Sequence, residues 1–518
     1  MHGHAARFRR RIQEGSAVSR GVNPLNLPRN TARQQQRERD TQQLHRLGYV
    51  QQLLRQMGGF SNFALSFSII SILTGAVTLY GYGLEHGGPL VMGLGWPLVT
   101  VMTLPVAASL AQLASAYPTA GALYHWSSIF GGAGWGFFTA WLNTIGQVAI
   151  TAAADYGLAK FLAPMLGWPD DRAYLLALFV AILLSQAAFN HFGVRAVAVL
   201  NGLSAWYHLI GVIALVAVLA LFARLQPVQF LFRPFSAADQ PYLYGFLVGL
   251  LQAQWTFTGF DASAHVTEET IDPSRNAPWG IVLSVGVSGL AGYALLVAVT
   301  SAIVDLPVAV QAANPFIHIL RRALGEQLGG ALVWLVMGAM WFCGLSSLTS
   351  NSRMLFAFAR DGGLPASKYL KRVSPRFLSP HWAVWVCAAA ALAIGLWTPV
   401  YSAMVALSTL ALYASYGLPI ALGLWARSSG RWKARGPWDL GPWSPWVNAT
   451  ALGWVAIITV LFVLPPNQIA GYMFLGCVGV LAVYWLAYMR RRFRGPPIAT
   501  EVNGHVYRPS SKKRKGSP

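Results

Sequence analysis

The sequence predicts an all-α, polytopic membrane protein, and three observations lead to that fold class. First, 55% of the 518 residues are hydrophobic and only 11% are charged, whereas about a quarter of the residues of a soluble chain are charged. Second, mostly apolar stretches of roughly 20 residues, the length that crosses a bilayer as a helix, recur along the chain. Third, Lys and Arg are distributed unevenly between those stretches, as in membrane proteins.

Twelve apolar segments predict twelve transmembrane helices. In chain order they cover about residues 60–84, 88–113, 134–162, 172–190, 203–223, 242–264, 279–304, 328–351, 382–397, 400–424, 448–465 and 468–489. The connections between them leave no room for a separate soluble domain. We therefore expect one transporter-sized membrane domain over residues 56–490, with a basic N-terminal tail (1–55) and a basic C-terminal tail (491–518).

The basic residues orient these segments. If both tails are cytoplasmic, only six of the 38 Lys and Arg residues lie outside: Lys160, Arg172, Arg224, Arg233, Arg321 and Arg322. The positive-inside rule therefore predicts a multi-pass protein of the cell (plasma) membrane with both termini cytoplasmic. The net charge of +21 is explained by this distribution, so we expect no nucleic-acid partner. The arginines that follow the last span, at 490–494, are expected to meet anionic lipid headgroups.

Two spans, the first and the sixth, are interrupted by polar residues. Span one carries Ser66, Ser68, Ser71, Thr74 and Gly75 within an apolar run. Span six reads Gln-Ala-Gln-Trp-Thr-Phe-Thr-Gly-Phe-Asp-Ala-Ser over residues 252–263. Transporter sites are often built where spanning helices break near the bilayer midplane, at corresponding places in two internal repeats. The sequence therefore predicts a solute site at these two interruptions.

The backbone chemistry of such a break suits a zwitterion. An unwound helix leaves N–H and C=O groups that lipid cannot satisfy, whereas amides at a helix N-terminus attract a carboxylate and free carbonyls attract an ammonium group. The alternative is that the Ser and Thr hydroxyls bond back to their own helices. Asp261 favours the first interpretation, because a carboxylate inside a membrane is costly and usually functional.

Other polar residues allow two interpretations each. Four of them recur every four positions on one face of span three: Asn143, Gln147, Thr151 and Asp155. They either line the pathway or pack against the bundle, and Asp155 is expected near the outer interface. Glu268 and Glu269, which follow span six in the adjoining inner loop, could simply be solvated.

Four stretches of the chain resemble the amino acid–polyamine–organocation transporter superfamily, and within it the amino acid/choline transporter branch. They are residues 60–75, residues 114–121 (Ala-Ser-Ala-Tyr-Pro-Thr-Ala-Gly) with Tyr124 and Trp126, residues 258–270 (Thr-Gly-Phe-Asp-Ala-Ser-Ala-His-Val-Thr-Glu-Glu-Thr), and residues 352–365. Their order and placement match over most of residues 45–490.

The resemblance implies twelve helices, of which the first ten form two inverted five-helix repeats (helices 1–5 and 6–10) and two are extra. It implies that the solute lies between broken helices one and six. The substrate-binding positions are then Ser71, Ile72, Leu73, Thr74, Gly75, Trp255, Phe257, Thr258, Gly259 and Phe260. Trp255 or Phe257 is the expected gating aromatic. The family's coupling or gating positions fall on Asp261, Glu268 and Glu269.

The chain departs from the family at two places. Gln112 stands where an inner Glu is expected, and span five lacks the Lys that proton-coupled relatives can carry. His208 lies close to that position, and a His can titrate near physiological pH. We therefore expect proton symport with His208 or Asp261 as the titrating group. A packed, neutral His208 is the alternative for that residue, and Na⁺ symport through hydroxyls such as Ser346 is the alternative coupling.

The sequence thus predicts a secondary-active transporter (permease) for amino acids or related amines such as 4-aminobutyrate (GABA), choline or polyamines, working by alternating access. No protease, hydrolase or nucleotide-binding motif occurs, and the three cysteines lack metal-ligand spacing. We therefore expect no enzymatic activity, no catalytic residue, no metal and no cofactor. The alternatives are a nucleobase or urea-type permease of related fold and a receptor built on a transporter scaffold.

Overall fold

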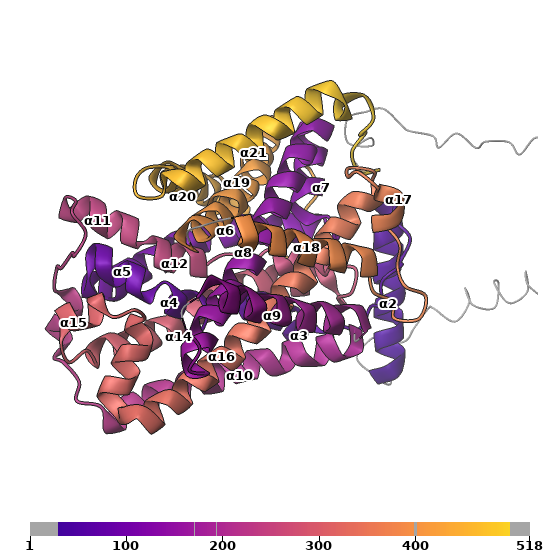
Figure 1. Ribbon diagram of the computed structural model, residues 1–518. Coiled ribbons are helices and arrows are strands. Elements are labelled where there is room, and N and C mark those ends of the chain that lie inside the picture. Colours follow the sequence, from indigo (N-terminus) through magenta and orange to yellow (C-terminus); the bar gives the residue numbers. More distant parts are fainter. Residues whose placement is uncertain (1–28, 170, 193, 398–400, 498–518) are drawn as a thin grey trace, which may run out of the picture.

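The computed structural model describes residues 29–497, apart from residues 170, 193 and 398–400, and this part of the chain forms helices and no strand (Figure 1). Within it, nine helical stretches are long and apolar enough to cross a membrane. They match nine of the predicted spans: α3 with α4 (Gly59–Ile70 and Gly75–Thr78), α6 (Trp96–Ala116), α9 (Arg172–Phe192), α10 (Val194–Phe222), α14 (Pro273–Ser301), α16 (Pro315–Arg360), α19 (Tyr401–Ser428), α20 (Ser444–Val463) and α21 (Gln468–Ala487). The predicted all-α membrane fold is confirmed.

The other three predicted spans are helical but differ from a plain apolar helix. α8 (Ala133–Met165) has 33 residues and carries the polar stripe. Span six is divided into α11 (Tyr242–Gly249), α12 (Leu251–Thr256) and α13 (Ala262–His265). α18 (His381–Trp397) has 17 residues, a little short of the roughly 20 that a span needs. The count of twelve spans stays a prediction.

The remaining helices lie between the long ones or, for α2 and η5, before the first and after the last of them. They are α2 (Arg29–Arg46), α5 (Tyr80–Gly87), η2 (Val91–Gly95), α7 (Ala122–Gly131), η3 (Val228–Phe232), α15 (Leu306–Gln311), α17 (Ser367–Leu370), η4 (Gly441–Trp443) and η5 (Met489–Arg491).

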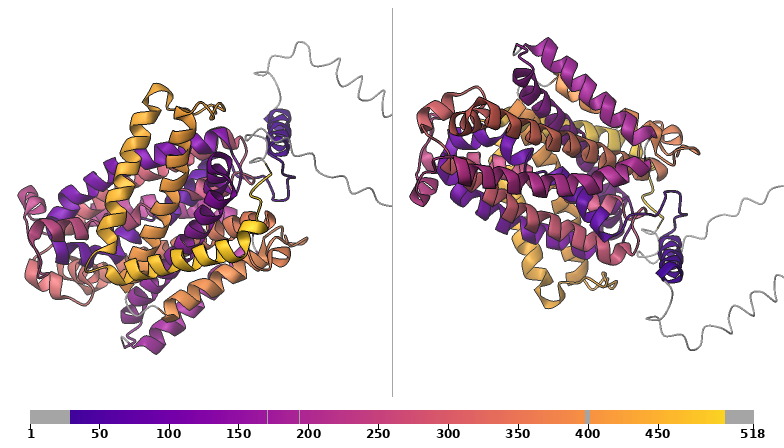
Figure 2. Two further views of the ribbon diagram at one scale, coloured as in Figure 1. Left: turned by 90° about the horizontal axis from the view of Figure 1, so that it is seen from above. Right: turned by 90° about the horizontal axis from the view of Figure 1, so that it is seen from below.

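The broken helices lie inside the bundle. In the apolar part of Gly59–Thr78, 83% of the residues are buried, whereas in the apolar part of Gln468–Ala487 (α21) only 17% are buried. α19 packs along α8, α14 packs along α6 and α3, and α16 packs along α8. Figures 1 and 2 show α20 and α21, in yellow, along one side of the molecule. The long helices therefore enclose α3, α4, α12 and α13, and the two last spans are peripheral.

Both ends of the described chain lie at one end of the bundle, which we call the tail end. α2 and α17 lie at this end, while α5, α11 and α15 lie at the opposite end (Figure 1). A Cβ atom added to Gly48 would lie 2.8 Å from the Cβ of Pro497. The two tails thus start from the same end, as the predicted topology requires; that this end is cytoplasmic stays a prediction.

Candidate functional site

Span one is broken where the sequence places a break. α3 ends at Ile70, and Ser71 has a φ of 35° in the left-handed region, before α4 starts at Gly75. The carbonyl of Ser71 accepts hydrogen bonds from the amides of Thr74 and Gly75 at 2.7 and 2.8 Å. The amides of Ile72 and Leu73 make no hydrogen bond to a protein group in the described part of the chain. These residues are buried, so the break presents two free N–H groups away from water.

Span six is broken at Phe257–Asp261, between α12 and α13. Gly259 has a φ of 81°, a conformation that glycine adopts without the penalty of a side chain. Its amide donates to the hydroxyl of Tyr416 at 3.1 Å, and the carbonyl of Phe257 accepts from the hydroxyl of Tyr413 at 2.6 Å. Two tyrosines of α19 therefore satisfy part of the unwound backbone.

The two breaks face each other at close range. A Cβ added to Gly75 would lie 2.8 Å from the Cα of Thr256, and one added to Gly259 would lie 2.2 Å from Cγ2 of Ile69. The hydroxyl of Ser66 also donates to the carbonyl of Phe260 at 2.9 Å. The glycines at these positions allow a backbone approach that any larger residue would prevent.

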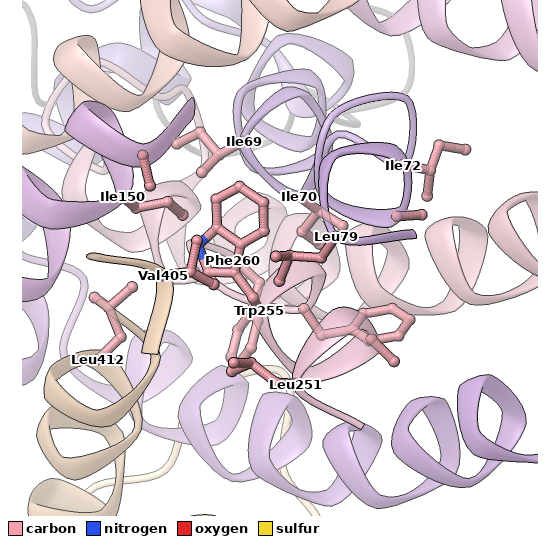
Figure 3. Close-up of a cluster of buried hydrophobic side chains, with 14 of the residues drawn as sticks. Ile69, Ile70, Ile72, Leu79, Ile150, Leu251, Trp255, Phe260, Val405 and Leu412 are labelled. Carbon is pink, nitrogen blue, oxygen red and sulfur yellow. The ribbon is translucent and has the colours of Figure 1, made fainter. Parts of the chain in front are cut away.

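Apolar side chains from four helices surround the breaks (Figure 3). They come from α3 and its break, α8, α12 with its break, and α19: Ile69, Ile70, Ile72, Ile150, Leu251, Trp255, Phe260, Val405 and Leu412. The indole N–H of Trp255 is buried and makes no hydrogen bond within the described residues. The predicted substrate-binding residues are thus brought together in one buried place that offers unpaired N–H donors in an apolar surrounding.

Asp261 is fully buried beside the second break, and its carboxylate is surrounded by hydrogen-bond donors. Oδ1 accepts from the hydroxyl of Tyr416 at 2.7 Å. Oδ2 accepts from the side-chain amides of Asn143 at 2.9 Å and Gln147 at 3.4 Å, and lies 3.0 Å from Nε2 of His265. Half of the polar stripe of span three therefore faces the site.

Asp155, at the other end of that stripe, is not at the outer interface as expected. Its side chain is fully buried, and Oδ1 accepts a hydrogen bond from the amide of Gln186 on α9 at 2.9 Å. The expectation was wrong because α9 and α16 cover this face of α8, which the stripe itself does not reveal.

His208 lies against the first break. Its Nε2 is 2.7 Å from the hydroxyl of Ser71, and its Nδ1 is 2.8 Å from the carbonyl of Ser204. The ring is fully buried. His208 is therefore next to a predicted substrate-binding residue, and it forms no ion pair with an acidic residue of the described chain.

Glu268 and Glu269 are buried and paired, so they are not solvated. Glu268 forms a two-point ion pair with Arg360 at 2.8 and 2.9 Å, and Glu269 accepts from Nε of Arg353 at 2.9 Å. Both arginines belong to the tail end of α16. The two ion pairs hold the segment after α13 against α16 at this end of the molecule.

Residues 40–57 run across that end, and we call them the strap. Arg55 donates to the carbonyls of Thr267 and Thr270, and the amide of Met57 donates to the carbonyl of Glu269 at 2.9 Å. Gln51 donates to the carbonyl of Glu268 at 2.8 Å. The last part of the predicted N-terminal tail is therefore packed against the segment that carries Glu268 and Glu269.

A cluster around Asp361 joins the strap to α7. The hydroxyl of Tyr49 donates to Asp361 at 2.7 Å, Tyr124 donates to the same oxygen, and Nε2 of His125 lies 3.1 Å from it. Burial lowers the pKa of His125 below its ordinary value, so its ring is neutral at neutral pH. Although burial acts to raise it, the hydrogen bond from His125 and the charge of Arg360 hold the pKa of Asp361 below its ordinary value.

The opposite end of the molecule is hollowed. A pocket of about 230 Å³ is lined by residues that follow the first break, such as Thr78, and by Glu85, Lys160 and Tyr401. A second pocket of about 690 Å³ adjoins it and shares Lys160. The hollow therefore begins within one helical turn of the first break, whereas the tail end is closed by ion pairs.

A sequence model of amino acid permeases matches residues 57–485. The chain belongs to the amino acid permease family. Over 88% of its length it is 34% identical to the amino-acid permease BAT1 of Arabidopsis thaliana, of which it covers 95%, and 35% identical to the BAT1 homolog of Oryza sativa subsp. japonica, of which it covers 94%. It is also 28% identical, over 90% of its length, to a GABA-specific permease of Saccharomyces cerevisiae, of which it covers 87%. The predicted family and the transporter class are confirmed.

Several residues of the permease's site escaped the sequence analysis. His265, Tyr413 and Tyr416 contact the second break or Asp261, and Arg353 and Arg360 pair with the gate glutamates. His265 stands four residues after Asp261, a spacing that places both on one helical face. That spacing is the sequence pattern that could have placed His265 at the site. No local pattern distinguishes Tyr413 and Tyr416 from other residues of an apolar span.

Proposed function

We propose that this permease carries amino acids or related amines across the membrane by alternating access, as a secondary-active transporter with a co-transported proton. The observation that carries the proposal is the pair of facing helix breaks, buried at the centre of the bundle and lined by apolar side chains. Unpaired N–H groups in such a place need a polar partner, and a small zwitterion supplies one.

In this proposal the solute's carboxylate meets the free amides of Ile72 and Leu73. Its ammonium group meets carbonyls of the break at Thr258–Phe260, and Trp255 and Phe257 cover it. The positions Ser71–Gly75 and Trp255–Phe260 together form the binding site. Because the surrounding side chains are apolar, a neutral side chain on the solute fits better than a charged one.

The gating proposal follows from the two ends of the molecule. The pairs Glu268–Arg360 and Glu269–Arg353, with the strap across them, keep the tail end closed, while the opposite end is hollowed. Release of solute at the tail end requires these pairs to separate. His208 contacts the first break and Asp261 adjoins the second break, and these two residues are the coupling candidates.

We place the twelve spans in the plasma membrane with both tails cytoplasmic, supported by the uneven distribution of Lys and Arg. Arg490 and its neighbours then lie at the level of the cytoplasmic headgroups, where anionic lipids attract them. Residues 56–490 form the transport domain in this arrangement.

Uptake by purified protein in liposomes tests the function. Liposomes with an inward proton gradient are offered a panel of radiolabelled amino acids, GABA, choline and polyamines, one at a time. We expect accumulation of one or more amino acids or GABA, abolished by a protonophore and unchanged when Na⁺ is replaced by K⁺. Absence of uptake for the whole panel would reject the proposal, and strict Na⁺ dependence would reject the proton as co-transported ion.

A further inference from the structure

The ring of His265 faces a hydrogen-bond acceptor on each side. Nδ1 lies 3.1 Å from the backbone carbonyl of Ala120, and Nε2 lies 3.0 Å from Oδ2 of Asp261. A carbonyl only accepts, so Nδ1 carries a hydrogen. A neutral imidazole has a single N–H, which leaves a lone pair on Nε2, pointing at a carboxylate. Two acceptors on neutral His265 and ionised Asp261 would repel each other.

One extra proton removes that conflict. It either protonates His265, which then donates from both nitrogens, or it protonates Asp261, which then donates to Nε2. In both cases the pair holds one exchangeable proton and has no net charge. Because the proton can reside on either of two atoms that lie 3.0 Å apart, it belongs to the pair. We propose that His265 and Asp261 together form the binding site of the transported proton; this rests on the proposed proton-coupled amino-acid transport.

The groups around the pair fit a single bound proton. Asp261 accepts from Tyr416 of α19 and from Asn143 and Gln147 of α8, and these are neutral donors that stay in place in either form. Within the described residues, His265 is the one basic group that pairs with Asp261, and both side chains are fully buried. No neighbouring cation therefore holds Asp261 ionised without the proton.

Loss of the proton changes the contacts of α13. The pair is then a carboxylate beside a neutral imidazole, which has one N–H for two acceptors. Either the bond to Ala120 or the bond to Asp261 breaks. Ala120 lies in the segment between α6 and α7, so the proton determines whether α13 is tied both to that segment and, through Asp261, to α8 and α19.

The solute site is connected to the same pair. The hydroxyl of Tyr416 accepts from the amide of Gly259 in the second break and donates to Asp261. A solute that displaces the Gly259 amide thereby alters the hydrogen bonds of Asp261. Binding of solute and proton are therefore coupled through one tyrosine.

His208 does not need an extra proton. Its Nδ1 donates to the carbonyl of Ser204, and its Nε2 faces the hydroxyl of Ser71, which can itself donate. A neutral His208 satisfies both contacts. The geometry therefore assigns the proton to His265 and Asp261 and not to His208.

Full-length protein in liposomes tests the assignment with His265→Gln and Asp261→Asn. The probe is a radiolabelled mixture of the protein amino acids and GABA. Counterflow exchange, which needs no gradient, is compared with proton-driven accumulation and with acidification reported by an internal pH dye. We expect each variant to lose proton-driven accumulation and solute-dependent proton entry, while counterflow falls by a much smaller factor. His381→Gln, at the start of α18, is the matched control and should retain all three.

Each failure has its own meaning. Wild-type protein without counterflow would overturn the proposed function and this assignment with it. Wild-type counterflow without proton entry would overturn the co-transported proton and this assignment with it, while the carriage of amino acids would stand. Proton-driven accumulation by His265→Gln at the control level would overturn the assignment alone. If His265→Gln elutes as an aggregate, Asp261→Asn decides: counterflow without proton entry supports the pair, and intact proton entry refutes it.

Discussion

Arg360 illustrates how single charges close the tail end of the permease. Its guanidinium makes two hydrogen bonds to the fully buried Glu268 and lies over the ring of Tyr49, 4.0 Å from the ring centroid. A buried ion pair stabilises the folded protein little more than an apolar replacement would, but removal of one partner leaves an unpaired buried charge. The pair, which holds the tail end closed in the proposed gating, is therefore expected to be sensitive to single substitutions.

We predict that Arg360→Gln destabilises the closed state by roughly 3–5 kcal/mol, the usual cost of breaking a buried ion pair from one side. The melting temperature of the purified protein should fall clearly. The control is Arg321→Gln at the opposite end, where Glu326 is exposed and the side chain of Arg321 is 33% exposed, so the loss of this pair should cost about 0–1 kcal/mol. Equal effects of the two substitutions would contradict this account of the gate.

The cluster of Tyr49, His125 and Asp361 predicts a pH dependence. Because burial lowers the pKa of His125, the folded protein binds this proton less readily than the unfolded chain. The contribution of neutral His125 to the stability of the folded protein is therefore complete above about pH 6.5, the ordinary pKa of His. This contribution is lost as the pH falls below that value. The lowered pKa of Asp361 acts in the same direction at lower pH.

Melting temperatures measured between neutral and mildly acidic pH check this prediction. They should fall on acidification in the wild-type protein and fall less in His125→Gln, which has no group to protonate. An identical pH dependence in the two proteins would exclude His125 as a contributor.

At the scale of helices, the sequence located both breaks but not their partners. Ser71, Gly75 and Gly259 stand out within apolar runs, because polar and flexible residues inside a spanning helix indicate a place where its backbone departs from the helix. Tyr413 and Tyr416, in contrast, lie more than 150 positions away, in an otherwise ordinary apolar span. Their contact with the second break depends on how α19 packs against α12 and α8, and no local pattern encodes that packing.

The strap was likewise invisible as a structural element. Its sequence is polar and basic, and we expected only a tail over residues 1–55. Residues 1–28 of that tail lie outside the described part. The signals for packing were Leu44, Tyr49 and Leu53, which are buried, yet three spaced hydrophobic residues are too few to predict a docked segment.

We predict that Arg55→Gln loosens the strap, because Arg55 donates to two buried carbonyls of the gate segment and hydrogen bonds from charged groups contribute about 1.5–3 kcal/mol. Limited trypsin digestion in detergent should then cut after Arg46, the tryptic site that the variant keeps within residues 40–57, faster than in the wild type. Arg39→Gln, an exposed position on α2, is the control and should leave the rate unchanged. A wild-type rate in Arg55→Gln would contradict the role of this contact.

At the scale of the whole molecule, composition and charge were sufficient for the fold class, and four family-like stretches were sufficient for the family. The deficit of charged residues, the apolar spans and the four family-like stretches all extend over most of the chain, so local errors do not affect them. The number of spans, in contrast, depends on local details, because α18 is short and span six is divided.

The topology predicts that tags at both termini are protected together in right-side-out vesicles. The distribution of basic residues places both tails in the cytoplasm, and residues near both ends meet at Gly48 and Pro497. Protease protection of the two tags is the measurement. One protected tag and one cleaved tag would contradict the arrangement.

Uptake by a variant that separates the two breaks tests most directly whether the solute binds between them. In Gly75→Ala the new Cβ would lie 2.8 Å from the Cα of Thr256, whereas in Gly453→Ala on α20 it would meet nothing within 4 Å. With both proteins monodisperse in detergent, we predict that amino-acid or GABA uptake into liposomes is lost in Gly75→Ala and retained in Gly453→Ala. Uptake by Gly75→Ala at the wild-type rate and affinity would contradict a solute site at the facing breaks.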